Sequence, residues 1–160
     1  MSKAPAPCSK CKGEMSMSIV DPFQGEEGGV KISIHEMPAL VCAQGHKRFV
    51  HAEFAALLMD LMVSPESFRK VPGAVKKGLF KKRFHCPACD MELPGSPTGR
   101  QTQEVVAQLR KAQPFKVVVE MPIFKCGGCG KECIQSAEET AQLAFKATGH
   151  AYRSIDIHPN

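Results

Sequence analysis

Short turns rich in cysteine recur along this chain, and each half of the chain contains two of them. In order, the turns are Cys8-x-x-Cys11, Cys42-x-x-x-His46, Cys86-x-x-Cys89 and Cys126-x-x-Cys129. The tripeptide Glu-Met-Pro precedes the second turn of each half. A tetrahedral metal ion takes four nitrogen or sulfur ligands, and a doubled pattern of this kind is hard to obtain by chance. The pattern therefore predicts two metal sites, one in each half.

The second half supplies four sulfur ligands, from Cys86, Cys89, Cys126 and Cys129. Two such turns close a tetrahedral site and leave no position for water, which is typical of a structural zinc site. Iron accepts the same four sulfurs, so the spacing leaves iron open as an alternative. The other alternative is four buried thiols without a metal. We expect a metal, with zinc as the leading candidate.

The first half supplies three sulfur ligands, from Cys8, Cys11 and Cys42. Gly45 stands where the second half has its last cysteine, and His46 follows it. A long imidazole side chain absorbs the extra residue, so we expect His46 to be the fourth ligand. Alternatively His46 is a surface residue of a decayed site, or another histidine such as His35 or His51 takes its place.

Cys133 is left over in this scheme. It follows the last cysteine turn closely enough to compete as a ligand. The alternative, which we prefer, is a small buried apolar side chain at the start of the next element.

The composition is that of a folded protein, since 43% of the 160 residues are apolar and 23% are charged. No apolar leader is visible, and no apolar run approaches the roughly 20 residues that span a bilayer. We therefore expect a cytoplasmic protein without membrane contact, whose reduced cysteines are metal ligands rather than disulfides. The formal charge of +5 falls to about +2 once thiolates bind two divalent ions. Overall basicity is therefore weak evidence for nucleic-acid binding.

Alternating apolar residues predict two strands near the first turns, over 15–20 and 30–35. The Gly-rich segment 24–29 between them predicts the tip of a hairpin. A hairpin with metal ligands at its base is a zinc ribbon. In the second half we expect a strand over 115–120 and a short amphipathic helix over 102–112.

Apolar residues at helical spacing predict a helix over 51–63, and Ser64 begins a second, broken helix that ends near Lys82. A capping box from Ser136 to Glu139 predicts a C-terminal helix that Gly149 ends, followed by an edge strand in the tail. We therefore expect an α+β fold of two tandem zinc ribbons with β-hairpin knuckles, each followed by a helix. The expected parts are residues 1–63, a basic helical connector over 64–83, and residues 84–160.

A basic stretch without acidic residues occupies the expected connector. Its members are Arg69, Lys70, Lys76, Lys77, Lys81, Lys82 and Arg83. Such a cluster suits contact with nucleic acid or with an acidic partner, but a solvated surface has the same composition. Few aromatic residues lie nearby, so base stacking is poorly supported.

Motifs of known catalytic sites are missing from the chain. It has no H-E-x-x-H, no deaminase signature, no P-loop and no G-x-S-x-G. Both metal sites are expected to be closed, whereas a catalytic zinc keeps an open position. We therefore expect a protein that is not an enzyme.

The first 50 residues resemble the zinc-finger domain of the MqsA/YgiT-type antitoxins. The resemblance lies in the first cysteine turn, a gap of similar length that ends in a valine-rich strand, and Met37-Pro-Ala-Leu-Val-Cys42. It implies a domain that binds zinc through Cys8, Cys11 and Cys42 and helps to hold a partner toxin. The chain departs from the family at Gly45, and a second ribbon takes the place of the DNA-binding helix-turn-helix domain.

The doubled arrangement is similar to the double-CxxCG proteins of myxobacteria, some of which act as immunity proteins. Cys126-Gly-Gly-Cys129-Gly130 carries the full motif here. Both resemblances imply a protein that neutralises or regulates a partner protein. The alternative function is a nucleic-acid-binding zinc-ribbon protein that uses the basic stretch over 69–83.

Overall fold

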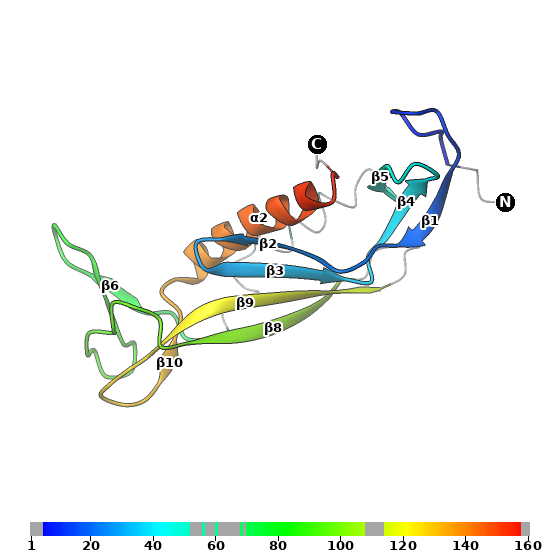
Figure 1. The fold of residues 1–160 in the computed structure, drawn as a ribbon. Coiled ribbons are helices and arrows are strands. Elements are labelled where there is room, and N and C mark those ends of the chain that lie inside the picture. The colour runs from blue at the N-terminus through cyan, green and yellow to red at the C-terminus, as the bar shows by residue number, and fades with distance from the viewer. Residues whose placement is uncertain are drawn as a thin grey trace.

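The computed structural model describes residues 5–51, 56, 60, 68, 70–107 and 114–157. Figure 1 shows an elongated molecule in which one helix lies along a twisted antiparallel sheet. The elements are β1 (Met15–Ile19), β2 (Phe23–Glu27), β3 (Val30–His35), β4 (Pro38–Cys42), β5 (Lys47–Phe49), β6 (Val75–Lys77), β7 (Arg83–His85), β8 (Gly99–Ala107), β9 (Phe115–Lys125), β10 (Glu132–Cys133) and α2 (Ala137–Ser154).

The main sheet is built around β9, which pairs with strands from both halves of the chain. β8 pairs with β9 along its whole length, from Gly99 opposite Ile123 to Ala107 opposite Phe115. β3 pairs with β9 as well, and β2 pairs with β3. All of these pairings are antiparallel. Strands from the expected parts 1–63 and 84–160 thus share one sheet, while the division of the chain at 63 and 84 stays a prediction.

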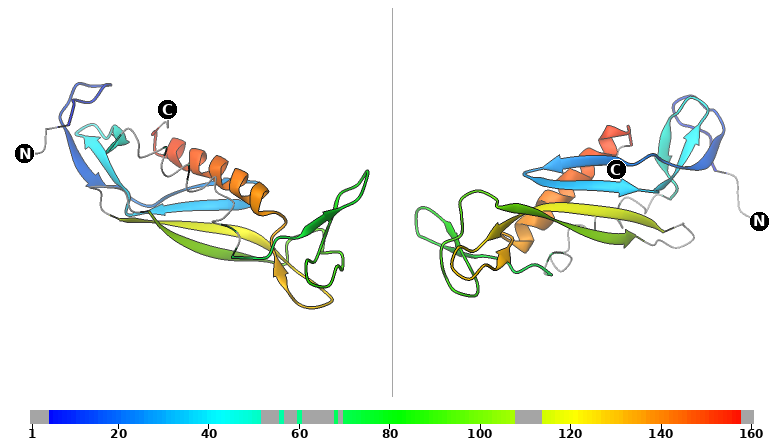
Figure 2. Two further views of the ribbon diagram at one scale, coloured as in Figure 1. Left: turned by 180° about the vertical axis from the view of Figure 1, so that it is seen from behind. Right: turned by 60° about the horizontal axis from the view of Figure 1, so that its bottom comes forward.

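One face of this sheet carries the core, as the period-two burial of its strands requires. Alternate residues of β3 and β9 are buried, and α2 packs against β2 and β3 (Figure 2). The helix presents small residues to the sheet, because Ala144, Ala147 and Ala151 are all fully buried. Gly25 of β2 lies directly beneath the last two, close to the helix backbone. The small side chains therefore let the helix and the sheet approach closely.

Two smaller units stand at opposite ends of the molecule (Figure 1). The sheet β1-β4-β5 carries the N-terminal cysteine turn and the turn between β4 and β5. At the other end, the hairpin of β6 and β7 leads into one cysteine turn, and the loop between β9 and β10 forms another. The two candidate metal sites are therefore far apart.

The expected α+β class is confirmed, and so is the helix start, where Ser136 Oγ accepts from the amide of Glu139 at 3.2 Å. The expected end is wrong, because α2 continues through Gly149 to Ser154. The expected edge strand in the tail is wrong too, since Tyr152 belongs to the helix and packs edge-on against Phe49, with ring centroids 5.0 Å apart. The free energy gained by burying one continuous face of the helix outweighs the low helix propensity of Gly149.

Three other expected elements differ. The expected hairpin is wrong, because 15–19 pairs with β4 while 30–35 pairs with β2, and only Gly28 and Gly29 form the turn between β2 and β3. The expected helix over 102–112 is a strand up to Ala107, because its β-branched residues pair along β9. The expected broken helix is a strand over 75–77. The expected helix over 51–63 lies largely outside the described residues.

Candidate metal centres

The four sulfur atoms of the second half meet where two turns face each other. The Sγ atoms of Cys86 and Cys129 lie 3.6 Å apart, and those of Cys89 and Cys126 lie 3.4 Å apart. Bonds of about 2.3 Å from zinc to sulfur at tetrahedral angles separate two sulfurs by about 3.8 Å. The observed separations are close to this edge length. All four ligand atoms lie within 4.8 Å of one another.

Three of the four turns have the same backbone geometry, which explains how a short segment presents two sulfurs. The carbonyl of the first cysteine accepts from the amide four residues on, and its own amide donates to the carbonyl five residues on. The residue four places after that cysteine has a positive φ, which closes the turn. These residues are Lys12 (φ 63), Asp90 (φ 66) and Gly130 (φ 76).

The fourth turn, which begins at Cys42, is one residue shorter. Here the Cys42 carbonyl accepts from the amide three residues on, Gly45, at 2.9 Å, and Gly45 itself has the positive φ of 85. The Cys42 amide then donates to the carbonyl of His46 at 3.1 Å. The backbone has therefore already turned back when it reaches His46, so the side chain of residue 46, rather than that of residue 45, is the one that can reach the site.

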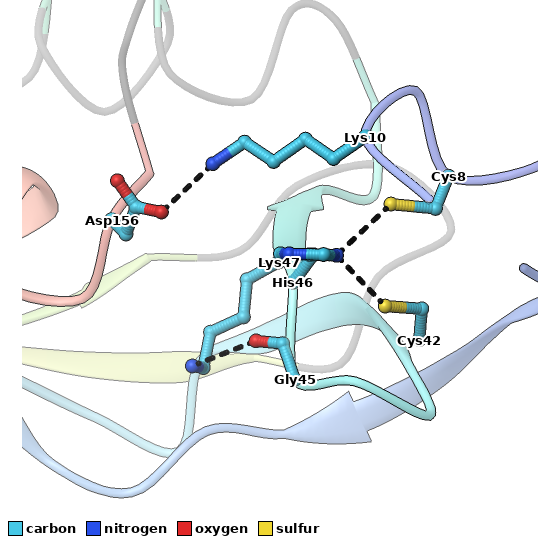
Figure 3. Close-up of polar contacts among 7 residues, drawn as sticks. All are labelled: Cys8, Lys10, Cys42, Gly45, His46, Lys47 and Asp156. Carbon is cyan, nitrogen blue, oxygen red and sulfur yellow. Dashed lines mark hydrogen bonds and ion pairs between the residues drawn. The ribbon is translucent and has the colours of Figure 1, made fainter. Parts of the chain in front are cut away.

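The side chain of His46 does return (Figure 3). Its Nδ1 lies 3.5 Å from Cys8 Sγ and 3.4 Å from Cys42 Sγ, and Cys11 Sγ lies 3.6 Å from Cys42 Sγ. These four ligand atoms also lie within 4.8 Å of one another. Nδ1 is therefore the atom that would face a metal ion, and the expected alternatives His35 and His51 are outside the group.

Backbone amides make the first cysteine of three turns more acidic. The Cys11 amide lowers the pKa of Cys8 to about 6, and the Cys89 amide lowers the pKa of Cys86 to about 6. The Cys129 amide lowers the pKa of Cys126 in the same way. Amides aimed at sulfur stabilise the thiolate, which is the form that binds a metal.

The crowding of four sulfurs acts in the opposite direction on Cys89. The Met91 amide lowers its pKa, but the Cys126 thiol and burial outweigh this and raise the pKa to about 12. Neighbouring sulfurs cannot all ionise without a cation between them. A divalent ion would remove this conflict, so the chemistry of the donor set fits a metal.

Cys133 lies outside the group of four ligands and is fully buried. It packs in a small apolar cluster with Leu93 and Phe124 beside the buried pair Cys86 and Cys126. Burial raises the pKa of its thiol to about 11. Its surroundings are those of a small core side chain.

Some of the cations in the basic stretch form ion pairs with acidic residues of the same chain. Lys76 pairs with Glu139 of α2 at 3.3 Å, Lys77 pairs with Asp90, and Arg83 pairs with Glu92 at 3.2 Å. Among the described residues, the exposed side chains of Lys70, Lys81 and Lys82 have no ion pair, and Arg69 lies outside the described residues. The structure therefore reduces the number of cations that the stretch offers to a phosphate backbone.

A shallow hollow of about 600 Å³ lies beside the junction of β1 and the main sheet. His35, Asp21, Glu36 and Glu104 contribute to its lining. It contains none of the eight candidate ligands. Sequence reasoning did not find this hollow, since its lining residues come from strands that are distant in the chain.

No helix in the part of the chain that the structure describes has the length and apolar character of a membrane span. No protein-family model matches the chain, and no curated protein or solved structure compared with it matches either.

Proposed function

We propose that this protein is a non-enzymatic zinc-binding interaction protein with two zinc ribbons, and that it binds and neutralises or regulates a partner protein. The observation that carries the proposal is the pair of four-ligand groups whose ligand atoms lie at tetrahedral separations. Four protein ligands leave a tetrahedral ion no position for water or substrate. The metals therefore act as scaffold rather than as catalysts.

Each metal ion would connect segments that are distant in the chain. Cys8 and Cys11 would be tied to Cys42 and His46, and the turn after β7 would be tied to the turn after β9. Zinc binding to such sites contributes folding free energy, on the order of 10 kcal/mol in small zinc-finger peptides. Each ribbon has only a small apolar cluster of its own, so this contribution decides whether its turns stay folded.

A protein is the partner that we favour over nucleic acid. The resemblance to antitoxin and immunity proteins supports this choice. Three cations of the basic stretch are already paired with Glu139, Asp90 and Glu92. The alternative function, nucleic-acid binding through residues 69–83, depends on the cations that remain. It predicts binding that weakens steeply with salt.

Elemental analysis of the purified full chain tests the metal sites. We expect two zinc ions per chain, and one ion or none would contradict the proposal. Iron at the four-sulfur site would change the metal but keep the scaffold role. The variants Cys89→Ser and His46→Ala each remove one candidate ligand. Each is expected to lower the zinc content by about one ion per chain.

Affinity capture from cells of the native source tests the partner. We expect a protein that binds with fixed stoichiometry after nuclease treatment. Expression of that protein alone should impair growth, and co-expression of this chain should restore it. The Cys89→Ser variant, whose change lies outside the core of the main sheet, tests whether the second ribbon takes part, provided that its circular dichroism spectrum matches that of the parent. Nucleic acid as the sole bound molecule would contradict the proposed role, whereas a bound protein without an effect on growth would assign regulation rather than neutralisation.

A further inference from the structure

The hairpin of β6 and β7 ends in an apolar tip that is open to solvent. Leu79 is 93% exposed and Phe80 is 100% exposed, and they are the two most exposed large apolar side chains of the described residues. Single exposed apolar side chains are common, but these two are adjacent in the chain, and contiguous apolar surface often marks an interaction site. We call residues 78–82 the apex.

The apex is held in place by the residues around it. Gly78 has a φ of 122, and a β-carbon there would overlap the carbonyl oxygen of Lys81, so the turn requires glycine. β6 and β7 pair from Val75 opposite His85 to Lys77 opposite Arg83. β7 then leads directly into Cys86, which is a ligand of the second candidate site. Metal binding there would fix the direction in which the apex points.

The charge of the hairpin is concentrated at its apex. The cations on the strands are neutralised by partners, since Lys76, Lys77 and Arg83 all form ion pairs. Lys81 and Lys82 are exposed, and neither has an ion pair among the described residues. Two exposed lysines without ion pairs, Lys81 and Lys82, thus lie next to two exposed apolar side chains, Leu79 and Phe80.

The dimensions of the apex favour one kind of partner. A stable interface between proteins buries about 800 Å² on each side, whereas two side chains such as Leu and Phe offer only roughly 400 Å². Nucleic acid is held through several phosphates, and the apex has two free lysines. A lipid interface needs no matching shape, and it accepts apolar side chains below anionic head groups.

The apex also has unobstructed access to a flat surface. The hairpin projects from the end of the molecule, beyond the sheet and α2, in both Figure 1 and Figure 2. The body of the protein would therefore not collide with a bilayer that touches the apex. The expectation of no membrane contact rested on the absence of a spanning segment, which has no bearing on peripheral contact.

We propose that the apex docks on an anionic lipid bilayer, with Leu79 and Phe80 in the interface and Lys81 and Lys82 on the head groups. This contact is peripheral and reversible. It adds to the protein a second site, whose residues are distinct from the eight candidate metal ligands.

A single tryptophan reports on the apex, because the chain has no natural one. The Phe80→Trp protein, loaded with zinc, is titrated with vesicles of phosphatidylcholine, alone or mixed equally with phosphatidylglycerol. We expect a blue shift of the emission with the anionic vesicles only. The Phe145→Trp protein, whose tryptophan would be on α2, should show no shift. No shift at the apex, or equal shifts at both positions, would overturn the proposal.

Two further variants in the Phe80→Trp background separate the contributions. Lys81→Gln with Lys82→Gln should weaken binding about twenty-five-fold, since each cation near the surface contributes about a fivefold change. Lys31→Gln with Lys146→Gln removes the same charge on β3 and α2, away from the apex and from both candidate metal sites, and should have little effect. Equal losses in the two double variants would indicate unspecific adsorption and overturn the proposal. Quenching by single-stranded polyuridylate, without a response to vesicles, would assign the apex to nucleic acid instead.

Discussion

Replacing Gly25 by alanine tests the close contact between α2 and the main sheet. The added β-carbon would overlap the carbonyl oxygen of Ala147 and the amide nitrogen of Ala151, and it would lie 3.0 Å from the Ala151 Cα. These are backbone atoms in the C-terminal half of α2, so no side-chain rotation relieves the overlap. The helix must move away from β2, and its buried alanines would lose contact with the sheet.

The magnitude follows from two opposing terms. Overpacking of a tight core costs about 1–3 kcal/mol. Alanine restricts the unfolded chain more than glycine does, which offsets about 0.4–1 kcal/mol of this cost. No left-handed φ is required at Gly25, so backbone strain adds nothing. We expect Gly25→Ala to lower the free energy of unfolding by about 1–2 kcal/mol, and the midpoint of thermal unfolding by a few degrees.

The assay is urea unfolding followed by far-ultraviolet circular dichroism, with zinc in excess so that metal loss does not contribute. Gly95→Ala is the matched control, because a β-carbon at Gly95 meets nothing within 4 Å. The control should be as stable as the parent or slightly more stable. If Gly25→Ala unfolds at the same urea concentration as Gly95→Ala, the close packing of helix and sheet is not as described.

Further predictions concern single side chains. His46→Cys is expected to keep both zinc ions, because a ligand Nδ1 and a cysteine Sγ hold zinc at about the same distance from the β-carbon; loss of about one ion would refute the placement of Nδ1 at the first site. Cys133→Ala should keep both zinc ions and cost about 1 kcal/mol or less, as measured by elemental analysis and urea unfolding. Tyr152→Phe should be neutral or stabilising at pH 7, because the buried hydroxyl has no hydrogen-bond partner among the described residues. Burial raises the pKa of the Tyr152 hydroxyl above its value of about 10 in the unfolded chain. The parent should therefore lose stability as the pH rises above about 10, and Tyr152→Phe should lose less. Equal dependence of the free energy of unfolding on pH in the two proteins would contradict this.

The two groups of candidate metal ligands could be predicted because a cysteine turn is a local structure. Each turn closes its own hydrogen bonds within six residues, as Cys86 does with Asp90 and Met91. The start of α2 was predictable for the same reason, since Ser136 caps an amide three residues away. The shortened turn was less accessible, although Gly45, with its positive φ, was a signal that the chain turns back there.

The strand β8 was missed because its residues fit two structures. Val105, Val106 and their neighbours show helical spacing, but they also alternate across a strand. The nine residue pairs that β8 forms with β9 select the strand over the helix. β9 begins only at Phe115, outside the window in which the helical spacing is read. Pairing between distant strands outweighs a weak local preference, and sequence spacing alone does not contain that pairing.

The repeat of Glu-Met-Pro in the sequence does not become a repeat in the structure. In the first half, Glu36 has a positive φ of 61 and breaks the chain between β3 and β4, which enter different sheets. In the second half, Glu120 lies inside β9, which continues to Lys125. The same tripeptide therefore separates two strands in the first half and lies within one continuous strand in the second half. The difference follows from the strands that pair with the residues before and after it.

The sequence by itself determined the two sets of candidate ligands, the α+β class and the capped start of the last helix. These depend on side-chain chemistry and hydrogen bonds between residues that are near in the chain. Only the tertiary structure decided that strands of both halves share one sheet, that the imidazole of His46 returns to its site, and that Leu79 and Phe80 stand free at the end of a hairpin. Those features depend on pairing and burial between distant segments, where many weak preferences compete and the geometry of the whole chain selects among them.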